Sequence, residues 1–420
     1  MARVRTANQV LVREINLSII RNALRELSPC SRAALAAATG LNKTTVSSLV
    51  RQLMDARFIS EVGAHQTKDT GRPGILLALN PKAGCMIGVE IGVDFISVIL
   101  TNFAVEIVWR RYNQTNPHDG QPSIIQRTLQ LIRTAVKQSA KHAERILGLG
   151  LGVPGLVDVA SGTLLFAPNL RWRDVPLRGI LESKFDFPIS VDNEANMAAL
   201  GESYFGVARG SKSLLYVSAG VGLGGGIVLD GRILPGAAGF AGEVGHMTMA
   251  VNGLPCNCGN HGCWETLVSQ RAVFRRVREA IAAGQRSSLE AATQGDLDAL
   301  TVPLVAQAAA HGDRVAAQAL EETATHLGIG LANLINVLNP ERVVFGGNLS
   351  LAGATLMPVI NRIIHERALR WSSDAVDVRV AAHGSDACVM GAVATVYHQV
   401  LNQSSARAAS ESQRASRKRR

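Results

Sequence analysis

The sequence predicts an α/β protein in which an N-terminal winged helix-turn-helix precedes a duplicated, two-lobed domain. Two observations predict this fold class. Short helical patterns and two strands fill residues 1–80, whereas long helices alternate with apolar strands over residues 81–403, where a hairpin of apolar strands occurs twice. A chain of 420 residues is too long for one compact core, which agrees with two or more domains.

Three helices at the start of the chain predict the helix-turn-helix. Residues 10–27 carry apolar side chains at the mixed spacing of an amphipathic helix. A second helix over residues 33–38 stops at Gly40, which suits a left-handed turn. Asn42 can then cap a third helix over residues 43–56. The stripe expected to be buried on the third helix is Val46, Leu49, Val50 and Leu53.

The other face of the third helix suits the major groove of double-stranded DNA. Short hydroxyl side chains allow close approach and adaptable hydrogen bonds, and two cations neutralise phosphates. Strands over residues 58–62 and 74–79 flank a polar wing, whose Arg72 could enter a minor groove. Any small three-helix unit can give such a pattern, but the turn, the wing and the local charge all favour DNA binding. The predicted DNA-binding residues are Lys43, Thr44, Thr45, Ser47, Ser48, Arg51 and Arg72.

Basic residues are concentrated at the two ends of the chain. Residues 1–80 hold 11 Lys and Arg against 5 Asp and Glu, residues 404–420 hold 6 against 1, and residues 81–403 hold 26 against 27. This distribution favours a polyanion-binding head and a disordered tail with nonspecific attraction to phosphate. We find no signal-peptide core and no apolar run of membrane-spanning length, so we expect a cytoplasmic, nucleoid-associated protein with no membrane partner.

The body of the chain predicts two similar lobes. A hairpin of buried strands over residues 86–100 turns near Asp94, and a second hairpin over residues 214–229 has a turn rich in glycine. That turn could present N–H groups to a phosphate or simply allow a tight hairpin. Because each half of the body begins with such a hairpin, the sequence predicts a cleft between the two halves. Further strands are predicted over residues 146–153 and 342–348, and helices over residues 123–142, 304–310 and 321–338.

Four side chains occur at the spacing of metal ligands. His246 precedes three clustered thiols, Cys256, Cys258 and Cys263, whereas the other three cysteines are dispersed. In a reducing compartment such a cluster favours a metal over disulfides, the alternative being cysteines that are merely buried. Three thiolates and an imidazole give Zn²⁺ a full tetrahedral set without an open position for water, so the zinc would be structural and would hold the loop 246–263.

Five motifs follow one another along the body of the chain. They are residues 193–202, the Gly-rich hairpin at 218–231, Glu243-Val-Gly-His246, Cys256-x-Cys-x4-Cys263-x-Glu265 and residues 343–347. In this order, and over about 300 residues, they resemble the ROK family of sugar kinases and sugar-responsive repressors, and the cysteine motif is specific. The resemblance implies an actin/hexokinase-like (ribonuclease H-like) fold for the body. With its DNA-binding head, the chain resembles the repressor branch, particularly the xylose-repressor type.

The same resemblance implies a sugar site near the turn at Pro154 and Gly155. Carboxylates accept hydrogen bonds from neighbouring sugar hydroxyls, and an amide offers both a donor and an acceptor. The alternative for Glu243 and Glu265 is that they are solvated loop acids. The residues implied to line the site are Asn193, Glu194, Glu243, His246 and Glu265.

Two departures from the family's kinases indicate that the protein is not an enzyme. Glu194 stands where the kinases have an aspartate general base, and a carboxylate misplaced by about 1 Å can cost about 100-fold in rate. Asp94 stands where their phosphate loop has a threonine, and an anion there would repel nucleotide phosphates.

We therefore predict a homodimeric or homotetrameric repressor of carbohydrate-utilisation genes. A monosaccharide in the cleft would move the paired DNA-binding heads out of the spacing of a palindromic operator. One alternative is an ATP-dependent sugar kinase with a DNA-binding appendage. Another is a protein-docking module, in which a partner protein, instead of a sugar, releases the repressor.

Overall fold

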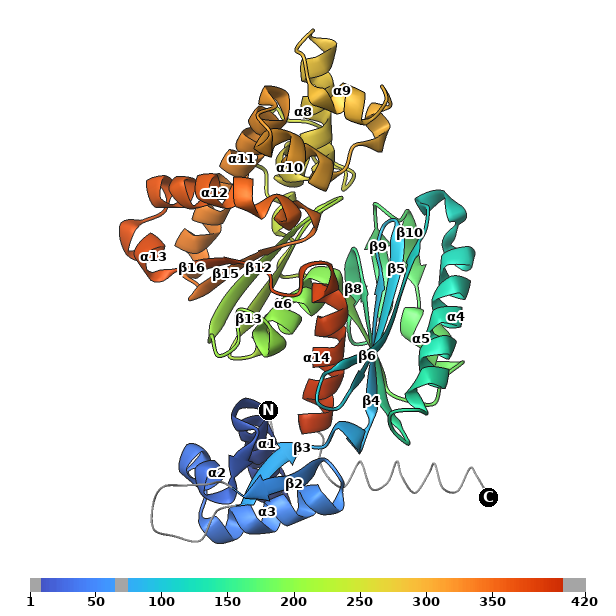
Figure 1. Ribbon diagram of the computed structural model, residues 1–420, viewed down its shortest axis with the longest axis vertical. Helices are drawn as coiled ribbons and strands as arrows, with labels where there is room; N and C mark the ends of the chain where they lie inside the picture. The colour runs from blue at the N-terminus through green and yellow to red at the C-terminus, as the bar shows by residue number, and fades with distance from the viewer. Residues whose placement is uncertain (1–8, 65–74, 403–420) are drawn as a thin grey trace.

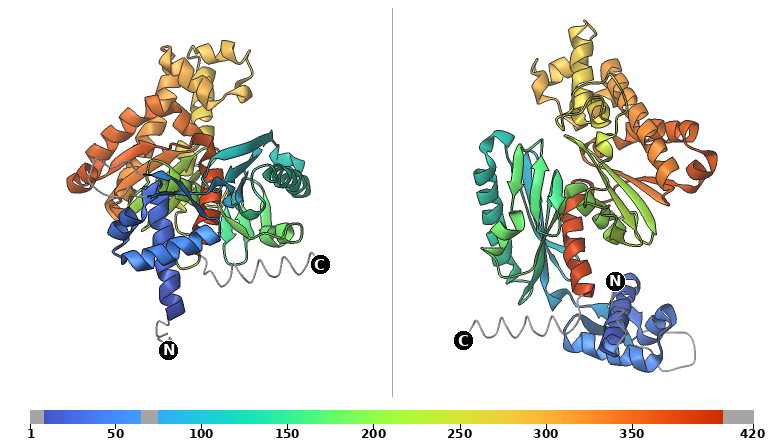
Figure 2. Two further views of the ribbon diagram at one scale, coloured as in Figure 1. Left: turned by 60° about the horizontal axis from the view of Figure 1, so that its bottom comes forward. Right: turned by 180° about the vertical axis from the view of Figure 1, so that it is seen from behind.

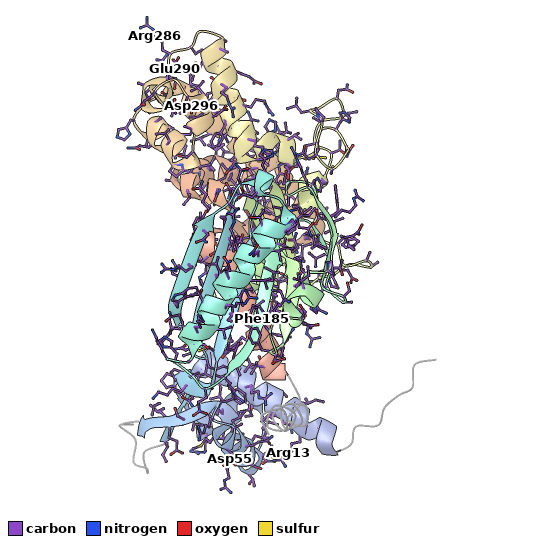
Figure 3. All side chains as sticks on the ribbon, turned by 90° about the vertical axis from the view of Figure 1, so that its right-hand side faces the viewer. Arg13, Asp55, Phe185, Arg286, Glu290 and Asp296 are labelled. Carbon is purple, nitrogen blue, oxygen red and sulfur yellow. The ribbon has the colours of Figure 1, made fainter. Side chains whose placement is uncertain are left out.

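The computed structural model describes residues 9–64 and 75–402, which form a small head and two α/β lobes (Figure 1). The head, at the blue end of the chain, lies beneath the lobes in Figure 1. Figure 3 shows how long the molecule is, with Arg13 and Asp55 of the head at one end and Arg286, Glu290 and Asp296 at the other. Among the described residues, no helix combines the length and apolar character needed to cross a membrane.

The head has the predicted winged-helix order. Its three helices enclose one apolar core, which a three-stranded antiparallel sheet in the order β1-β3-β2 closes. The first of these strands was not predicted, because two residues are too few to show a periodic pattern. The elements are α1 (Gln9–Leu27), β1 (Cys30–Ser31), α2 (Arg32–Thr39), α3 (Lys43–Asp55), β2 (Ile59–Ala64) and β3 (Ile75–Leu79).

Local hydrogen bonds set the turn between α2 and α3. Gly40 adopts a left-handed φ of 68°, and its N–H donates to the carbonyl of Ala36 at 3.0 Å. Asn42 caps α3 by accepting from the Thr45 N–H at 2.7 Å. The four predicted residues of the buried stripe on α3 are all buried. In contrast, Ile15 of α1 is exposed although its spacing matched the apolar pattern.

Each lobe contains a five-stranded sheet with the same topology. The first three strands form an antiparallel meander, and two more strands are added in parallel beside the first. The sheet orders are β11-β7-β4-β5-β6 and β14-β13-β12-β15-β16. This equivalence confirms the duplication predicted from the repeated hairpins. The strands of the first lobe are β4 (Cys85–Ile91), β5 (Phe95–Asn102), β6 (Ile107–Gln114), β7 (Ile146–Val153) and β11 (Ile189–Asn193). Those of the second are β12 (Ser213–Ala219), β13 (Leu223–Leu229), β14 (Arg232–Ile233), β15 (Arg342–Gly346) and β16 (Asp377–Val380).

Helices cover both faces of the two sheets (Figures 1 and 2). The outer face of the first sheet packs on α4 (Gln121–Ser139), and that of the second on α11 (Arg314–Leu338) and α12 (Gly353–Arg367). Two further helices, α6 (Glu194–Phe205) and α14 (Ala387–Asn402), lie between the sheets. The remaining elements are β8 (Leu156–Asp158), β9 (Thr163–Ala167), β10 (Trp172–Val175), α5 (Leu177–Glu182), α7 (Glu265–Val268), α8 (Gln270–Ala282), α9 (Ser288–Ala292), α10 (Val302–Ala310) and α13 (Arg370–Ala375), with short 3-10 turns between them.

Helix α11 begins earlier than the sequence pattern predicted. Its N-terminal cap is Asp313, which accepts a hydrogen bond from the Ala316 N–H at 3.0 Å. Residues 314–320 continue the buried face of the helix, because Val315, Ala316 and Leu320 enter the core of the second lobe. The predicted start at residue 321 was therefore about two turns late.

Helices α6 and α14 are in backbone-to-backbone contact. A Cβ atom built at Gly391 of α14 would lie 1.5 Å from the carbonyl oxygen of Met197, and one at Gly201 of α6 would lie 2.7 Å from that of Ala387. Only glycine allows so close an approach. The two helices therefore form one rigid unit between the lobes.

Candidate functional site

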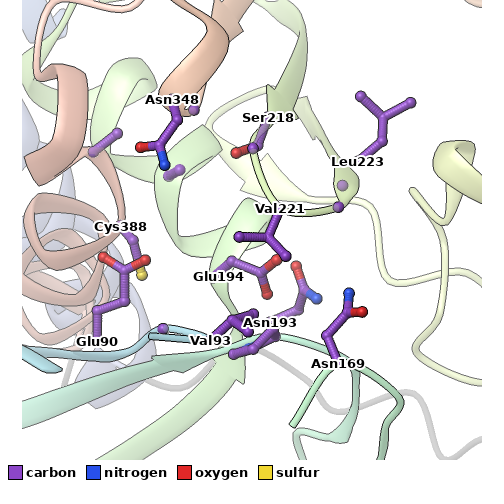
Figure 4. Close-up of a pocket in the computed structure, with 18 of the residues that line it drawn as sticks. Glu90, Val93, Asn169, Asn193, Glu194, Ser218, Val221, Leu223, Asn348 and Cys388 are labelled. Atoms are coloured by element: carbon purple, nitrogen blue, oxygen red, sulfur yellow. The ribbon is translucent and has the colours of Figure 1, made fainter. Parts of the chain in front are cut away.

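A cavity of about 270 Å³ lies between the two lobes. Its walls are the β4–β5 and β12–β13 turns, the N-terminal ends of α6 and α14, and the loop that follows β15 (Figure 4). Carboxyl and amide groups from both lobes meet there. The polar side chains that line it include Glu90, Asp94, Asn169, Asn193, Glu194, Ser218, Glu243, His246, Glu265, Asn348 and Asp386.

The structure brings all five residues implied for a sugar site to this one cavity, together with Pro154 and Gly155. Asn193 occupies the N-cap of α6, where its Oδ1 accepts from the Ala195 N–H at 2.7 Å. Its Nδ2 donates to the carbonyl of Gly155 at 3.0 Å. The amide therefore fixes the strand tip against the helix, and one N–H of Asn193 remains for a ligand.

Glu194 is the first residue of α6 and lies deep in the cavity (Figure 4). Burial raises the pKa of Glu194 well above its usual range, and the carboxyls of Glu90, Glu243 and Glu265 raise it further. Its Oε2 is buried and has no hydrogen-bond partner among the residues that the structure describes. A buried oxygen of this kind is costly unless a ligand or water supplies a donor.

Glu90 and Cys388 form a second buried group on the cavity wall, side by side in Figure 4. Glu90 is the next-to-last residue of β4 and is 8% exposed, and Cys388 is the second residue of α14. Burial raises the pKa of Glu90 to about 8, although a hydrogen bond from the Cys388 thiol acts in the opposite direction and lowers this pKa. The Glu90 carboxyl is therefore largely protonated near neutral pH, and it can donate a hydrogen bond.

Two acids connect the cavity to the predicted metal loop. The Oε2 of Glu243 lies 3.7 Å from Nε2 of His246, and burial raises the pKa of the Glu243 carboxyl. The Oε2 of Glu265 accepts from the Leu223 N–H at 2.9 Å, and its Oε1 lies 3.8 Å from Sγ of Cys256. Both acids line the cavity, and the Glu243 side chain is 37% exposed.

The four predicted metal ligands form a cluster at the cavity edge. One ligand atom from each of His246, Cys256, Cys258 and Cys263 lies within 4.8 Å of all the others. The Nδ1 of His246 is 3.8 Å from Sγ of Cys256, and the sulfurs of Cys258 and Cys263 are 3.8 Å apart. His246 thus turns Nδ1 toward the thiols and Nε2 toward Glu243. This donor set could hold a metal ion.

The metal loop also reaches across to the first lobe. Asn257, between two of the cysteines, donates through Nδ2 to Oδ1 of Asn169 at 3.1 Å. Asn169 follows β9 and lines the cavity. Its Nδ2 would lie 3.3 Å from a Cβ at Gly222, and Oε2 of Glu265 would lie only 2.5 Å from that atom. A side chain at Gly222 would therefore disturb both neighbours.

The predicted DNA-binding face of α3 is open. Lys43, Thr44, Ser47, Ser48 and Arg51 are exposed, and Thr45 is partly buried. Arg72 and the tip of the predicted wing lie outside the described residues, as does the basic tail at residues 404–420. The described surface of α3 is thus available to a groove of DNA.

Several cavity residues were not predicted from the sequence. Asn169 follows β9, Ser218 lies near the end of β12 and Asn348 follows β15, so only the folded sheets bring them together. Cys388 resembled an ordinary core cysteine. One sequence pattern could have pointed to the cavity. Glu90 and Asp94 flank the turn of the first hairpin, between β4 and β5, just as Ser218 and Gly222 flank the turn of the second, between β12 and β13.

The chain thus combines a head of three helices and a small antiparallel sheet with a duplicated body that encloses a cavity. A family model described as the ROK family matches residues 86–399. The chain belongs to the ROK family.

Its relatives include both repressors and kinases. A protein named putative xylose repressor, from Caldicellulosiruptor sp. (strain Rt8B.4), is 39% identical over 94% of this chain and 98% of its own length. A glucokinase from Halalkalibacterium halodurans is 38% identical over 73% of this chain and 92% of its own length. The crystal structure of a ROK family transcriptional regulator, a homolog of the E. coli MLC protein, matches with a TM-score of 0.79 at 27% identity. That match covers 93% of this chain and 97% of the regulator.

Proposed function

We propose that the protein is a sugar-responsive transcriptional repressor of carbohydrate-utilisation genes. The observation that carries this proposal is the buried Oε2 of Glu194, which has no hydrogen-bond partner within the described part of the chain and faces a cavity of carboxyl and amide groups. A sugar hydroxyl would supply the missing donor. The other four site residues are Asn193, Glu243, His246 and Glu265. Similarity over more than 90% of the chain to a putative xylose repressor (94%) and to a ROK family transcriptional regulator (93%) supports the same function.

The DNA partner is a palindromic, double-stranded operator bound by a homodimer or homotetramer. In our proposal the exposed face of α3 enters the major groove, and Arg72 contacts the adjacent minor groove. Sugar binding favours a closed arrangement of the lobes, which the contact between Asn169 and Asn257 already begins. Closure displaces the two heads from half-site spacing.

We propose that the metal is a structural Zn²⁺ ion. At a Zn–S distance of about 2.3 Å, a regular tetrahedron has edges of about 3.8 Å. The 3.8 Å separations between Cys258 and Cys263 and between His246 and Cys256 fit such an ion. The four protein ligands would complete its coordination, so zinc would hold the loop against the cavity and would supply no reactive water.

In this proposal the body does not transfer phosphate. Asp94 lines the cavity in the β4–β5 turn, where a carboxylate disfavours nucleotide phosphates. Glu194 occupies the place of the kinases' aspartate with a longer side chain. The similarity to a glucokinase makes phosphoryl transfer the second candidate function.

Two measurements on the purified full-length chain test the proposal. Operator fragments are first selected from random duplex DNA, and their affinity is then measured with and without D-xylose, D-glucose and N-acetylglucosamine. We expect one sugar to raise the melting temperature and to weaken operator binding by roughly 5- to 150-fold. Operator affinity that no sugar changes would contradict the proposal. Sugar-dependent release of ADP from ATP at ordinary turnover would establish the kinase instead.

A further inference from the structure

Helix α14 contacts both the cavity and the head. Its first residues, Ala387 and Cys388, line the cavity, and Val400 and Leu401 of its last turn line a small pocket shared with the head. Its 16 residues span about 24 Å at about 1.5 Å per residue. Figure 1 shows the helix running from the gap between the lobes down to the head. One unbroken helix therefore joins the two sites of the proposed function.

A buried arginine forms the contact at the head. Arg21 of α1 is 8% exposed, and its Nη1 donates to the carbonyl oxygens of Leu401 at 2.9 Å and Val400 at 3.2 Å. Carbonyls in the last turn of a helix lack intrahelical partners, and the helix dipole favours a cation there. Burial lowers the pKa of Arg21 to about 10, so the group stays charged near neutral pH. The guanidinium therefore binds the end of α14 specifically.

Aromatic rings pack around this contact and join the head to the body. The ring of Phe58 in the head lies 5.2 Å from that of Phe103, which lies 5.3 Å from the ring of Tyr397 on α14. The guanidinium groups of Arg21 and Arg145 lie 5.9 and 5.1 Å from the Phe58 ring centroid. The head is thus docked on α14 and is not merely tethered by the chain.

The other end of α14 is fixed to the sugar-site helix. The glycine contacts at Gly391 and Gly201 leave no space for α14 to slide along α6. Helix α6 begins with Glu194 and is capped by Asn193. A displacement of these two residues would therefore move α14 as a rigid body.

We propose that Arg21 is the positioning residue through which α14 sets the orientation of the DNA-binding head according to the state of the cavity. Sugar bound at the start of α6 shifts α6 and α14 together, and Arg21 makes the head follow the last turn of α14. This inference rests on the proposed function, because it assigns the route by which the sugar site acts on operator binding. Arg21 does not line the cavity and is not among the predicted DNA-binding residues.

Three full-length variants test the route. Arg21→Met keeps a long apolar side chain but removes the charge and the hydrogen bonds to the carbonyls of Val400 and Leu401, and Arg21→Lys restores the charge. Arg57→Met is the matched control, since Arg57 also bridges head and body, 3.8 Å from Glu144, but through an exposed ion pair. The readout is the coupling factor, which is the factor by which sugar weakens operator binding. The sugar used is the one from the panel that stabilises the wild type best.

We expect Arg21→Met to bind sugar and operator each within about 3-fold of the wild type, while the coupling factor falls below about 2-fold. Arg21→Lys should recover part of the coupling, and Arg57→Met should retain all of it. A wild-type coupling factor in Arg21→Met would overturn the assignment. Absence of sugar binding in the wild type would instead contradict the proposed function.

A measurement without sugar tests the contact itself. Amide hydrogen exchange should become faster in Arg21→Met over residues 396–402 and over the second half of α1, because the docked head opens more often. Exchange in Arg57→Met should match the wild type. Unchanged protection in Arg21→Met would overturn the role of Arg21 even if no panel sugar binds.

Discussion

The carboxylate of Glu265 accepts a hydrogen bond from the backbone N–H of Leu223 at 2.9 Å and thereby joins the metal loop to the Gly-rich hairpin of the second lobe. Glu265 stands two residues after Cys263, so any movement of the metal cluster is passed to the hairpin. The shape of the cavity thus depends on residues that lie outside it.

Removal of one thiol should release the metal and weaken sugar binding together. We expect Cys258→Ser to lower the zinc content from about one per chain to near zero, because a structural site requires all four ligands. Sugar affinity should fall by at least about 10-fold, since ligand contacts in a misplaced pocket are lost. Metal analysis and calorimetry measure both effects. The control is Cys30→Ser, a change in the core of the head, which should leave the zinc content of the protein unchanged. Full sugar affinity in Cys258→Ser would show that the metal loop does not shape the sugar site.

Phosphorylated sugars should bind far more weakly than free sugars. Apart from the Glu90 and Glu194 carboxyls, whose pKa values burial raises, the carboxyls of Asp94, Glu243, Glu265 and Asp386 line the cavity, and within the described part of the chain no Lys or Arg lines it. Arg110 pairs with Asp386 at the rim. We expect D-glucose 6-phosphate or D-xylose 5-phosphate to bind at least about 100-fold more weakly than the parent sugar, with a difference that narrows at high salt. Equal affinity for the two forms would refute this charge discrimination.

Glu90 should make the stability of the sugar-free protein depend on pH. Its folded pKa of about 8 exceeds the ordinary 4.5, so the folded state holds a proton that the unfolded state has lost between these values. The favourable contribution of Glu90 protonation to the free energy of unfolding is complete below pH 4.5 and disappears as the pH rises toward 8. Above pH 8, Glu90→Gln should raise the free energy of unfolding on the order of 4 kcal/mol relative to the wild type. Urea unfolding at pH 5 and pH 8.5 measures this, with exposed Glu144→Gln as the control.

Arg51 should contribute to operator affinity without affecting the sugar. Its side chain is exposed on the predicted DNA-binding face of α3. We expect Arg51→Ala to weaken operator binding by about 10-fold and to reduce the slope of log affinity against log salt by about 1, the effect of one lost phosphate contact. The control is Arg133→Ala, because Arg133 is an exposed residue of α4 in the body. This variant should change neither quantity. An unchanged salt slope in Arg51→Ala would remove this residue from the interface.

Much of the fold could be predicted because its signals are local. The cap at Asn42, the left-handed Gly40 and the strand at residues 146–153 depend on neighbouring residues, and the structure places all three as predicted. The duplicated lobes followed from two similar hairpins. In contrast, the two residues of β1 form a strand only because β3 lies beside them.

The site was predicted in part, for a related reason. Glu243, His246 and Glu265 are close in sequence, and the resemblance to a family implied that they share one cavity with Asn193 and Glu194. Asn169 and Cys388 reach it through long-range packing, which spacing along the chain does not record. Arg21 had no distinguishing signal, because its partners are carbonyl oxygens at the opposite end of the chain.

The two lobes have exchanged their last helices. Helix α6 follows the final strand of the first sheet but packs on β12 and β13 of the second, and α14 follows the final strand of the second sheet but packs on β4 and β7 of the first. Each half of the duplicated body therefore lacks a cover for one sheet face when it is alone. We expect a chain divided near residue 210 to yield two fragments that are insoluble separately and that assemble when they are refolded together.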